Sequence, residues 1–111
     1  MKKVIEISGV TLEVEFTFST FKKLGKLWGK KTLKEVMEHV TLATSGYGEN
    51  NVAFESMEVF SDIVSVFDKE DKLSEDEIQD HLFANPEVIT LLVEAFINSL
   101  VVNEPEEVKK K

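Results

Sequence analysis

Residues 86–101 constrain the fold most, because a helix there would be apolar around nearly its whole circumference. Asn85-Pro86 predicts its start, since proline suits the first helical position. At 100° per residue, apolar side chains cover most of the helix, namely Val88, Ile89, Leu91, Leu92, Val93, Ala95, Phe96, Ile97, Leu100 and Val101. Such a helix must lie at the centre of a domain or be covered in part by another chain.

The polar strip on this predicted helix is narrow. It consists of Thr90, Glu94 and Asn98. A small domain has few elements with which to cover the remaining circumference, so a central helix and a partly intermolecular one both stay open. If the helix packed through one face only, one apolar side would be hard to account for. This side is formed by Val93, Ile97 and Leu100.

Residues 3–16 predict a β-hairpin, because apolar and polar side chains alternate on either side of Ser8-Gly9. A two-residue turn there pairs Ile7 with Val10 and Ile5 with Leu12 on one face. The other face then pairs Glu6 with Thr11 and Lys2 with Glu15. An isolated hairpin is only marginally stable, so we expect its apolar face to pack against helices.

After Phe18 the apolar residues no longer alternate with polar ones and instead recur every three or four positions, as in a helix. Besides 86–101, the pattern predicts helices at about 19–29, 33–44, 53–67 and 75–83. We expect Ser19 or Thr20 to cap the first of these and Gly29 to end it. Capping boxes are expected at Thr32–Glu35 and Ser74–Glu77, and residues 45–51 read as a loop.

These elements predict one α+β domain, mainly α, over residues 1–102. An N-terminal β-hairpin is followed by about five helices in a small bundle. Residues 103–111 should form a flexible charged tail, because they are polar and include a proline. A chain of 111 residues has room for one modest core.

The composition argues against several classes of function. The chain has no cysteine, which excludes disulfides and thiolate metal sites. Its net charge of −8 and the absence of arginine disfavour nucleic-acid binding. The segment MKKVIEISG lacks the apolar run of a signal peptide, and no stretch approaches the ~20 apolar residues of a membrane span, so we expect a soluble, cytosolic protein.

Charge is unevenly distributed along the sequence. Residues 1–34 carry a net +5 and residues 35–111 a net −13. This asymmetry is compatible with head-to-tail self-association, and it is also compatible with ordinary solvated surface charge.

No catalytic or metal-binding motif stands out. His39 and His81 lie on different predicted helices without a third ligand at metal spacing. The segment from Asp68 superficially resembles a calcium-binding EF-hand loop. That loop needs glycine at its sixth position and glutamate at its twelfth, where this chain has Leu73 and Gln79. We therefore predict neither a metal site, nor a cofactor, nor an enzymatic activity.

The order of features resembles the tail assembly chaperones of long-tailed bacteriophages and prophages. The resemblance covers residues 3–101 and is carried by four segments: VIEISGVTLEVEFTFSTFKKLGKLWG, TLKEVMEHVTLATSGYGEN, FESMEVFSDIVSVF and LSEDEIQDHLFANPEVITLLVEAFINSL. In that family a short hairpin with a glycine turn leads to a helix with aromatic and leucine positions. Acidic helical segments follow and end in a hydrophobic helix.

The resemblance implies a non-enzymatic role in the cytoplasm of the host bacterium. Such proteins bind the tape measure protein, keep it soluble and recruit tail tube subunits, and they are absent from the mature virion. A homo-oligomer is expected. Family members often occur as a short form and a frameshifted longer form, and Lys109-Lys110-Lys111 would fit a slippery codon run.

The apolar pattern and the resemblance together suggest a groove that receives apolar helices of the client. Its candidate walls are Phe18, Leu24, Trp28, Val93, Ile97 and Leu100. An alternative interpretation is a small acidic regulator or inhibitor that binds a basic nucleic-acid-binding protein, since acidic residues cluster around 68–80. Binding of that kind would weaken steeply with salt, whereas apolar binding would not.

Overall fold

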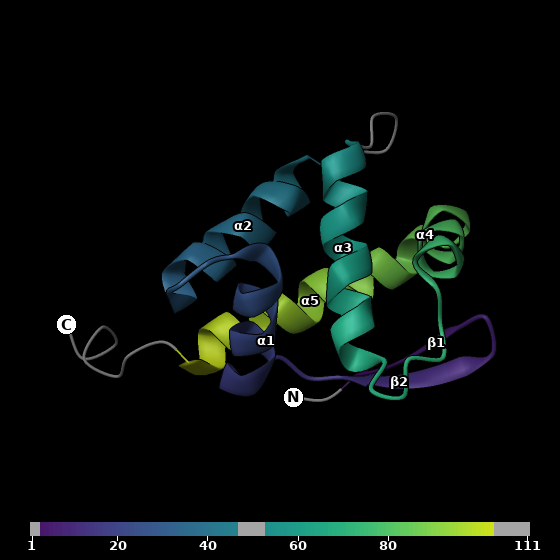
Figure 1. Ribbon diagram of the computed structural model, residues 1–111, viewed down its shortest axis with the longest axis horizontal. Coiled ribbons are helices and arrows are strands. Elements are labelled where there is room, and N and C mark those ends of the chain that lie inside the picture. Colours follow the sequence, from purple (N-terminus) through teal and green to yellow (C-terminus); the bar gives the residue numbers. More distant parts are fainter. Residues whose placement is uncertain (1–2, 47–52, 104–111) are drawn as a thin grey trace.

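The computed structural model describes residues 3–46 and 53–103 and has a two-stranded hairpin followed by five helices (Figure 1). Strands β1 (Lys3–Ile7) and β2 (Val10–Val14) are antiparallel. The predicted pairs Ile7 with Val10, Ile5 with Leu12 and Glu6 with Thr11 are all confirmed. The expected pair of Lys2 with Glu15 lies outside the described residues.

The hairpin turn has positive φ at both central residues, 50° at Ser8 and 84° at Gly9. This is the pattern of turns whose twist matches that of the flanking strands, and it explains why the second position is glycine. The face of the hairpin toward the helices is buried and consists of Ile5, Ile7, Leu12 and Val14.

Helix α1 (Phe18–Trp28) begins earlier than predicted, because its N-cap is Thr17 and not Ser19 or Thr20. The Thr20 amide donates to the Thr17 hydroxyl at 3.3 Å, and the Thr17 amide donates to the Thr20 hydroxyl at 3.2 Å. Thr20 is thus the reciprocal partner in a capping box. Its own hydroxyl also donates to the Glu15 carbonyl at 3.0 Å, which ties α1 to the end of the hairpin.

The remaining helices lie close to their predicted positions. They are α2 (Leu33–Ser45), α3 (Phe54–Phe67), α4 (Glu75–Ala84) and α5 (Pro86–Asn103). The capping boxes at Thr32 and Ser74 and the left-handed Gly29 that ends α1 are confirmed. Ser45 belongs to α2 and not to the expected loop, whose residues 47–51 lie outside the described residues. Likewise Asn103 belongs to α5, and the expected tail from 104 onward lies outside them.

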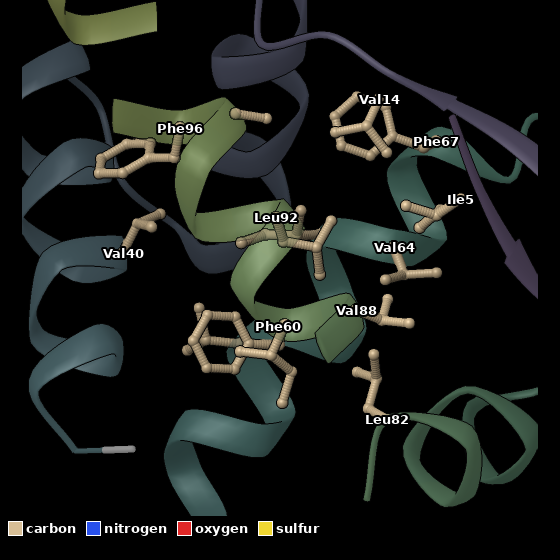
Figure 2. Packing of buried hydrophobic residues seen from close by; sticks show 14 of the residues in the cluster. Ile5, Val14, Val40, Phe60, Val64, Phe67, Leu82, Val88, Leu92 and Phe96 are labelled. Carbon is tan, nitrogen blue, oxygen red and sulfur yellow. The ribbon is translucent and has the colours of Figure 1, made fainter. Parts of the chain in front are cut away.

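Helix α5 supplies the centre of the core. Its residues Val88, Leu92 and Phe96 point among side chains of the hairpin, α2, α3 and α4 (Figure 2). The rings of Phe16 and Phe96 are 5.7 Å apart and nearly perpendicular, a favourable edge-to-face arrangement. Phe16 also packs edge-to-face on Phe67 of α3 at 5.4 Å, so one aromatic cluster joins the hairpin to two helices.

The side of α5 away from this core is not fully covered within the described residues. Ile97 is 50% exposed, while Val93 and Leu100 are half-buried. The helix is therefore central on one side and keeps an apolar surface on the other.

Candidate protein-binding surface

The structure separates the six predicted wall residues by exposure: Leu24 is buried, Trp28, Val93 and Leu100 are half-buried, and Phe18 and Ile97 are exposed. Leu24 is fully buried in the core at 0% exposure, so it lines no surface that a partner could reach. It lies on the inner face of α1, and its apolar character alone did not distinguish it from an exposed residue. Phe18 is 69% exposed, as a wall residue would have to be.

Trp28 has a structural role in addition to a partly exposed ring. Its indole Nε1 donates to Asp62 Oδ2 on α3 at 2.7 Å. Its ring centroid lies 4.4 Å from that of His39 on α2. Burial lowers the pKa of His39, and the nearby Lys30 ammonium lowers it further, so both favour the neutral imidazole. Trp28 thus holds α1, α2 and α3 together.

An open groove of about 730 Å³ lies between α2 and the end of α5, and most of the surface that lines it is apolar. Its lining residues are Leu33, Lys34, Met37, Glu38, Thr41, Leu42 and Leu100. This α2–α5 groove contains one of the predicted wall residues, Leu100. Leu42 is 70% exposed and Leu33 38%, so the groove presents apolar side chains to solvent.

The contribution of α2 to the groove was missed from the sequence. The spacing of apolar residues in the sequence predicts one apolar face on this helix, formed by Leu33, Val36, Met37, Val40 and Ala43, and none of the six predicted wall residues lies on it. In the structure Val36 is buried, but Met37 is half-buried and Leu33 is exposed. The available signal was Leu42, an apolar residue that lies off that predicted face.

A second hollow, of about 220 Å³, lies between α1 and α2. Its apolar part is formed by Phe18, Phe21, Gly25, Leu33 and Val36. Four lysines surround it, namely Lys22, Lys26, Lys30 and Lys31, and Thr32 completes the lining. We call this hollow the lysine-rimmed pocket. Leu33 lines both it and the α2–α5 groove.

Gly25 allows the close approach of α1 and α2 on which the lysine-rimmed pocket depends. A Cβ at this position would lie 3.1 Å from the carbonyl oxygen of Lys30 and 3.3 Å from a methyl of Val36. The carbonyl of Gly25 itself accepts a 2.8 Å hydrogen bond from the Lys30 amide. A larger residue would therefore push the lysine-bearing connection away from α1.

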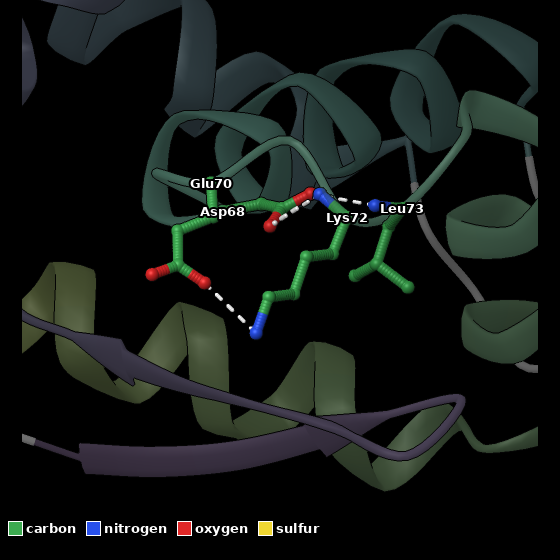
Figure 3. A network of polar contacts seen from close by, with 4 residues as sticks. All are labelled: Asp68, Glu70, Lys72 and Leu73. Carbon is green, nitrogen blue, oxygen red and sulfur yellow. Dashed lines mark hydrogen bonds and ion pairs between the residues drawn. The ribbon is translucent and has the colours of Figure 1, made fainter.

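The acidic segment after α3 forms a turn held by backbone hydrogen bonds. The buried Asp68 carboxylate accepts from the amides of Lys72 at 3.1 Å and Leu73 at 2.8 Å (Figure 3). Glu70 pairs with the Lys72 ammonium at 2.8 Å, and this contact raises the pKa of Lys72. Both carboxylate oxygens of Asp68 thus stabilise the turn.

Over residues 3–46 and 53–103, no group of three or more His, Asp or Glu side chains is placed to hold a metal ion. In the same ranges, no helix has the length and apolar character needed to cross a membrane.

Comparison with protein-family models, with curated proteins and with solved structures finds no match to this chain.

Proposed function

We propose that this protein is a non-enzymatic tail assembly chaperone of a long-tailed bacteriophage or prophage. It binds and solubilises the tape measure protein and helps to recruit tail tube subunits, acts in the host bacterial cytoplasm and leaves before the virion is complete. The observation that carries the proposal is the α2–α5 groove, an apolar surface on an otherwise strongly acidic domain. The order of hairpin and helices in the sequence supports the same assignment.

The groove suits a helical client with an apolar strip. A helix laid in a groove is recognised by side chains spaced three and four residues apart, which would contact Leu42, Met37 and Leu100. The charged lining residues are Lys34 and Glu38, one of each sign, so the groove itself carries no net charge. Binding should therefore depend mainly on apolar area, and many weak contacts along a long client would hold by avidity.

The test is co-expression of the tape measure protein with the Leu42→Asp variant. A carboxylate at this position would lose its hydration when an apolar side chain of the client packs on it, so we expect the soluble fraction of the client to fall several-fold. Leu42 is mostly exposed, so the variant should keep its circular dichroism spectrum and its unfolding midpoint.

Leu27→Asp is the matched control, because Leu27 is also an exposed helical leucine, at 54%, and lies outside the groove. We expect it to keep the client soluble as wild type does. Equal solubility with both variants would contradict the proposed groove. Binding of the client that disappears in about 0.5 M salt would instead favour the acidic regulator.

A further inference from the structure

Two surfaces on opposite sides of the molecule are complementary in charge, and each also presents apolar side chains. One is the lysine-rimmed pocket between α1 and α2. The other is a stripe on α4, formed by Asp76, Asp80 and Phe83. Neither surface is part of the α2–α5 groove, although Leu33 lines both that groove and the lysine-rimmed pocket.

The pocket is apolar inside and cationic outside. Within the described residues, Lys22, Lys26 and Lys31 form no ion pair with a carboxylate, whereas Lys30 interacts electrostatically with Glu35 at the edge of the pocket. Its volume of about 220 Å³ accommodates one aromatic side chain. Phe18, at 69% exposure, provides an apolar wall that such a ring could cover. The pocket therefore fits an apolar side chain that is accompanied by carboxylates.

The stripe on α4 has that composition. Residues at positions i, i+4 and i+7 lie on one face of a helix, and here they are Asp76, Asp80 and Phe83. Ile78 and Leu82 on the opposite face are buried, so the stripe points away from the core. Phe83 is 76% exposed, a large aromatic surface left in water beside two carboxylates.

The two surfaces cannot meet within one molecule. In Figure 1, α1 and α2 lie on one side and α4 on the other, with α3 and α5 between them. The lysine-rimmed pocket belongs to the basic part of the sequence and α4 to the acidic part, whose net charges are +5 for residues 1–34 and −13 for residues 35–111.

We propose that the lysine-rimmed pocket of one copy receives Phe83 of a second copy, with Asp76 and Asp80 of that copy facing the lysines. The interface is head-to-tail, so each copy keeps one free pocket and one free stripe. Copies then add in open chains whose average length grows with concentration. The contact combines burial of an aromatic ring with charge pairing, and salt weakens the second contribution.

The experiment measures the mass of the full chain by sedimentation equilibrium at low salt over a range of concentrations. We expect the weight-average mass of the wild type to rise above the monomer value of 12.6 kDa and to fall back in about 1 M NaCl. The pocket variant Lys22→Glu/Lys26→Glu and the stripe variant Phe83→Glu should each stay monomeric. All three substitutions are at exposed positions, so the fold should be kept.

Mixing the two variants provides the decisive readout. An equimolar mixture retains one intact pocket and one intact stripe on different molecules, so we expect heterodimers of twice the monomer mass and nothing larger. Phe54→Glu is the matched control, since Phe54 is the other strongly exposed phenylalanine beside acidic residues, at 88%. It should associate as wild type does.

Three results would overturn the inference. They are a wild type that stays monomeric up to about 1 mM, a stripe variant that still associates while Phe54→Glu does not, and a mixture that remains monomeric. None of these variants alters a residue of the α2–α5 groove. If the self-association test fails, the client-solubility test still stands. If the client-solubility test fails, the self-association test still stands.

Discussion

At the scale of single residues, Asp68 shows how an acidic position in a suspected metal loop serves the fold. It is 6% exposed, and its two carboxylate oxygens accept from the amides of Lys72 and Leu73. These bonds turn the chain from α3 into the start of α4. In the segment that resembles a calcium loop, the first acidic side chain therefore binds backbone amides of the same segment.

Replacing Asp68 with alanine should destabilise the protein by about 1–3 kcal/mol, because the buried Leu73 amide would lose its acceptor. Urea unfolding followed by circular dichroism measures the change. Asp68→Asn keeps one acceptor oxygen and should lose less. If alanine and asparagine were both as stable as wild type, the turn would not depend on these two hydrogen bonds.

At the scale of elements, the start of α1 depends on which of three neighbouring hydroxyl residues caps it. Thr17, Ser19 and Thr20 all have the side chain of an N-cap. Only Thr17 both stands before the helix and finds a partner three residues later, in Thr20. Starting the helix at Phe18 places Phe21 and Leu24 in the core and leaves Phe18 exposed beside the lysine-rimmed pocket.

We expect Thr17→Ala to destabilise the protein by about 1 kcal/mol, the usual effect of losing an N-cap. Ser19→Ala, at an exposed position inside the first turn, should change stability by less than about 0.5 kcal/mol. The midpoints of urea unfolding of the two variants give the comparison. A larger loss for Ser19→Ala than for Thr17→Ala would place the cap at Ser19, one of the two positions expected from the sequence.

At the scale of the whole molecule, the aromatic cluster around Phe16 joins the hairpin to the helices. Phe16 lies within 5.7 Å of the rings of Phe21, Phe67 and Phe96, which belong to three different helices. A hairpin of this size is marginal alone, so its stability comes from this junction and from its buried face.

Phe16→Ala should cost about 3–5 kcal/mol, a large part of the ~5–15 kcal/mol that stabilises a typical domain. We expect a lower thermal midpoint and loss of the aromatic circular dichroism signal. Phe18→Ala provides the control two residues away, since its ring is mostly exposed and should matter little to stability. Equal effects of the two substitutions would contradict the role of the cluster.

The sequence by itself determined the elements and most of their ends. Alternation around Ser8-Gly9 specified the register of the hairpin, because a two-residue turn permits only one pairing. Capping boxes at Thr32 and Ser74 specified two helix starts, because a capping box involves only residues three positions apart. The proline at the start of α5 specified another, because its φ is fixed near the helical value.

Only the tertiary structure decided which apolar side chains stay exposed. Leu24 and Phe18 are both apolar residues of α1, yet one is fully buried and the other exposed, because α2, α3 and α5 cover a single side of that helix. For the same reason Leu42 and Leu100, 58 residues apart, come to line one groove. Periodicity orders residues around a helix axis, but the neighbours that cover each side come from distant parts of the chain.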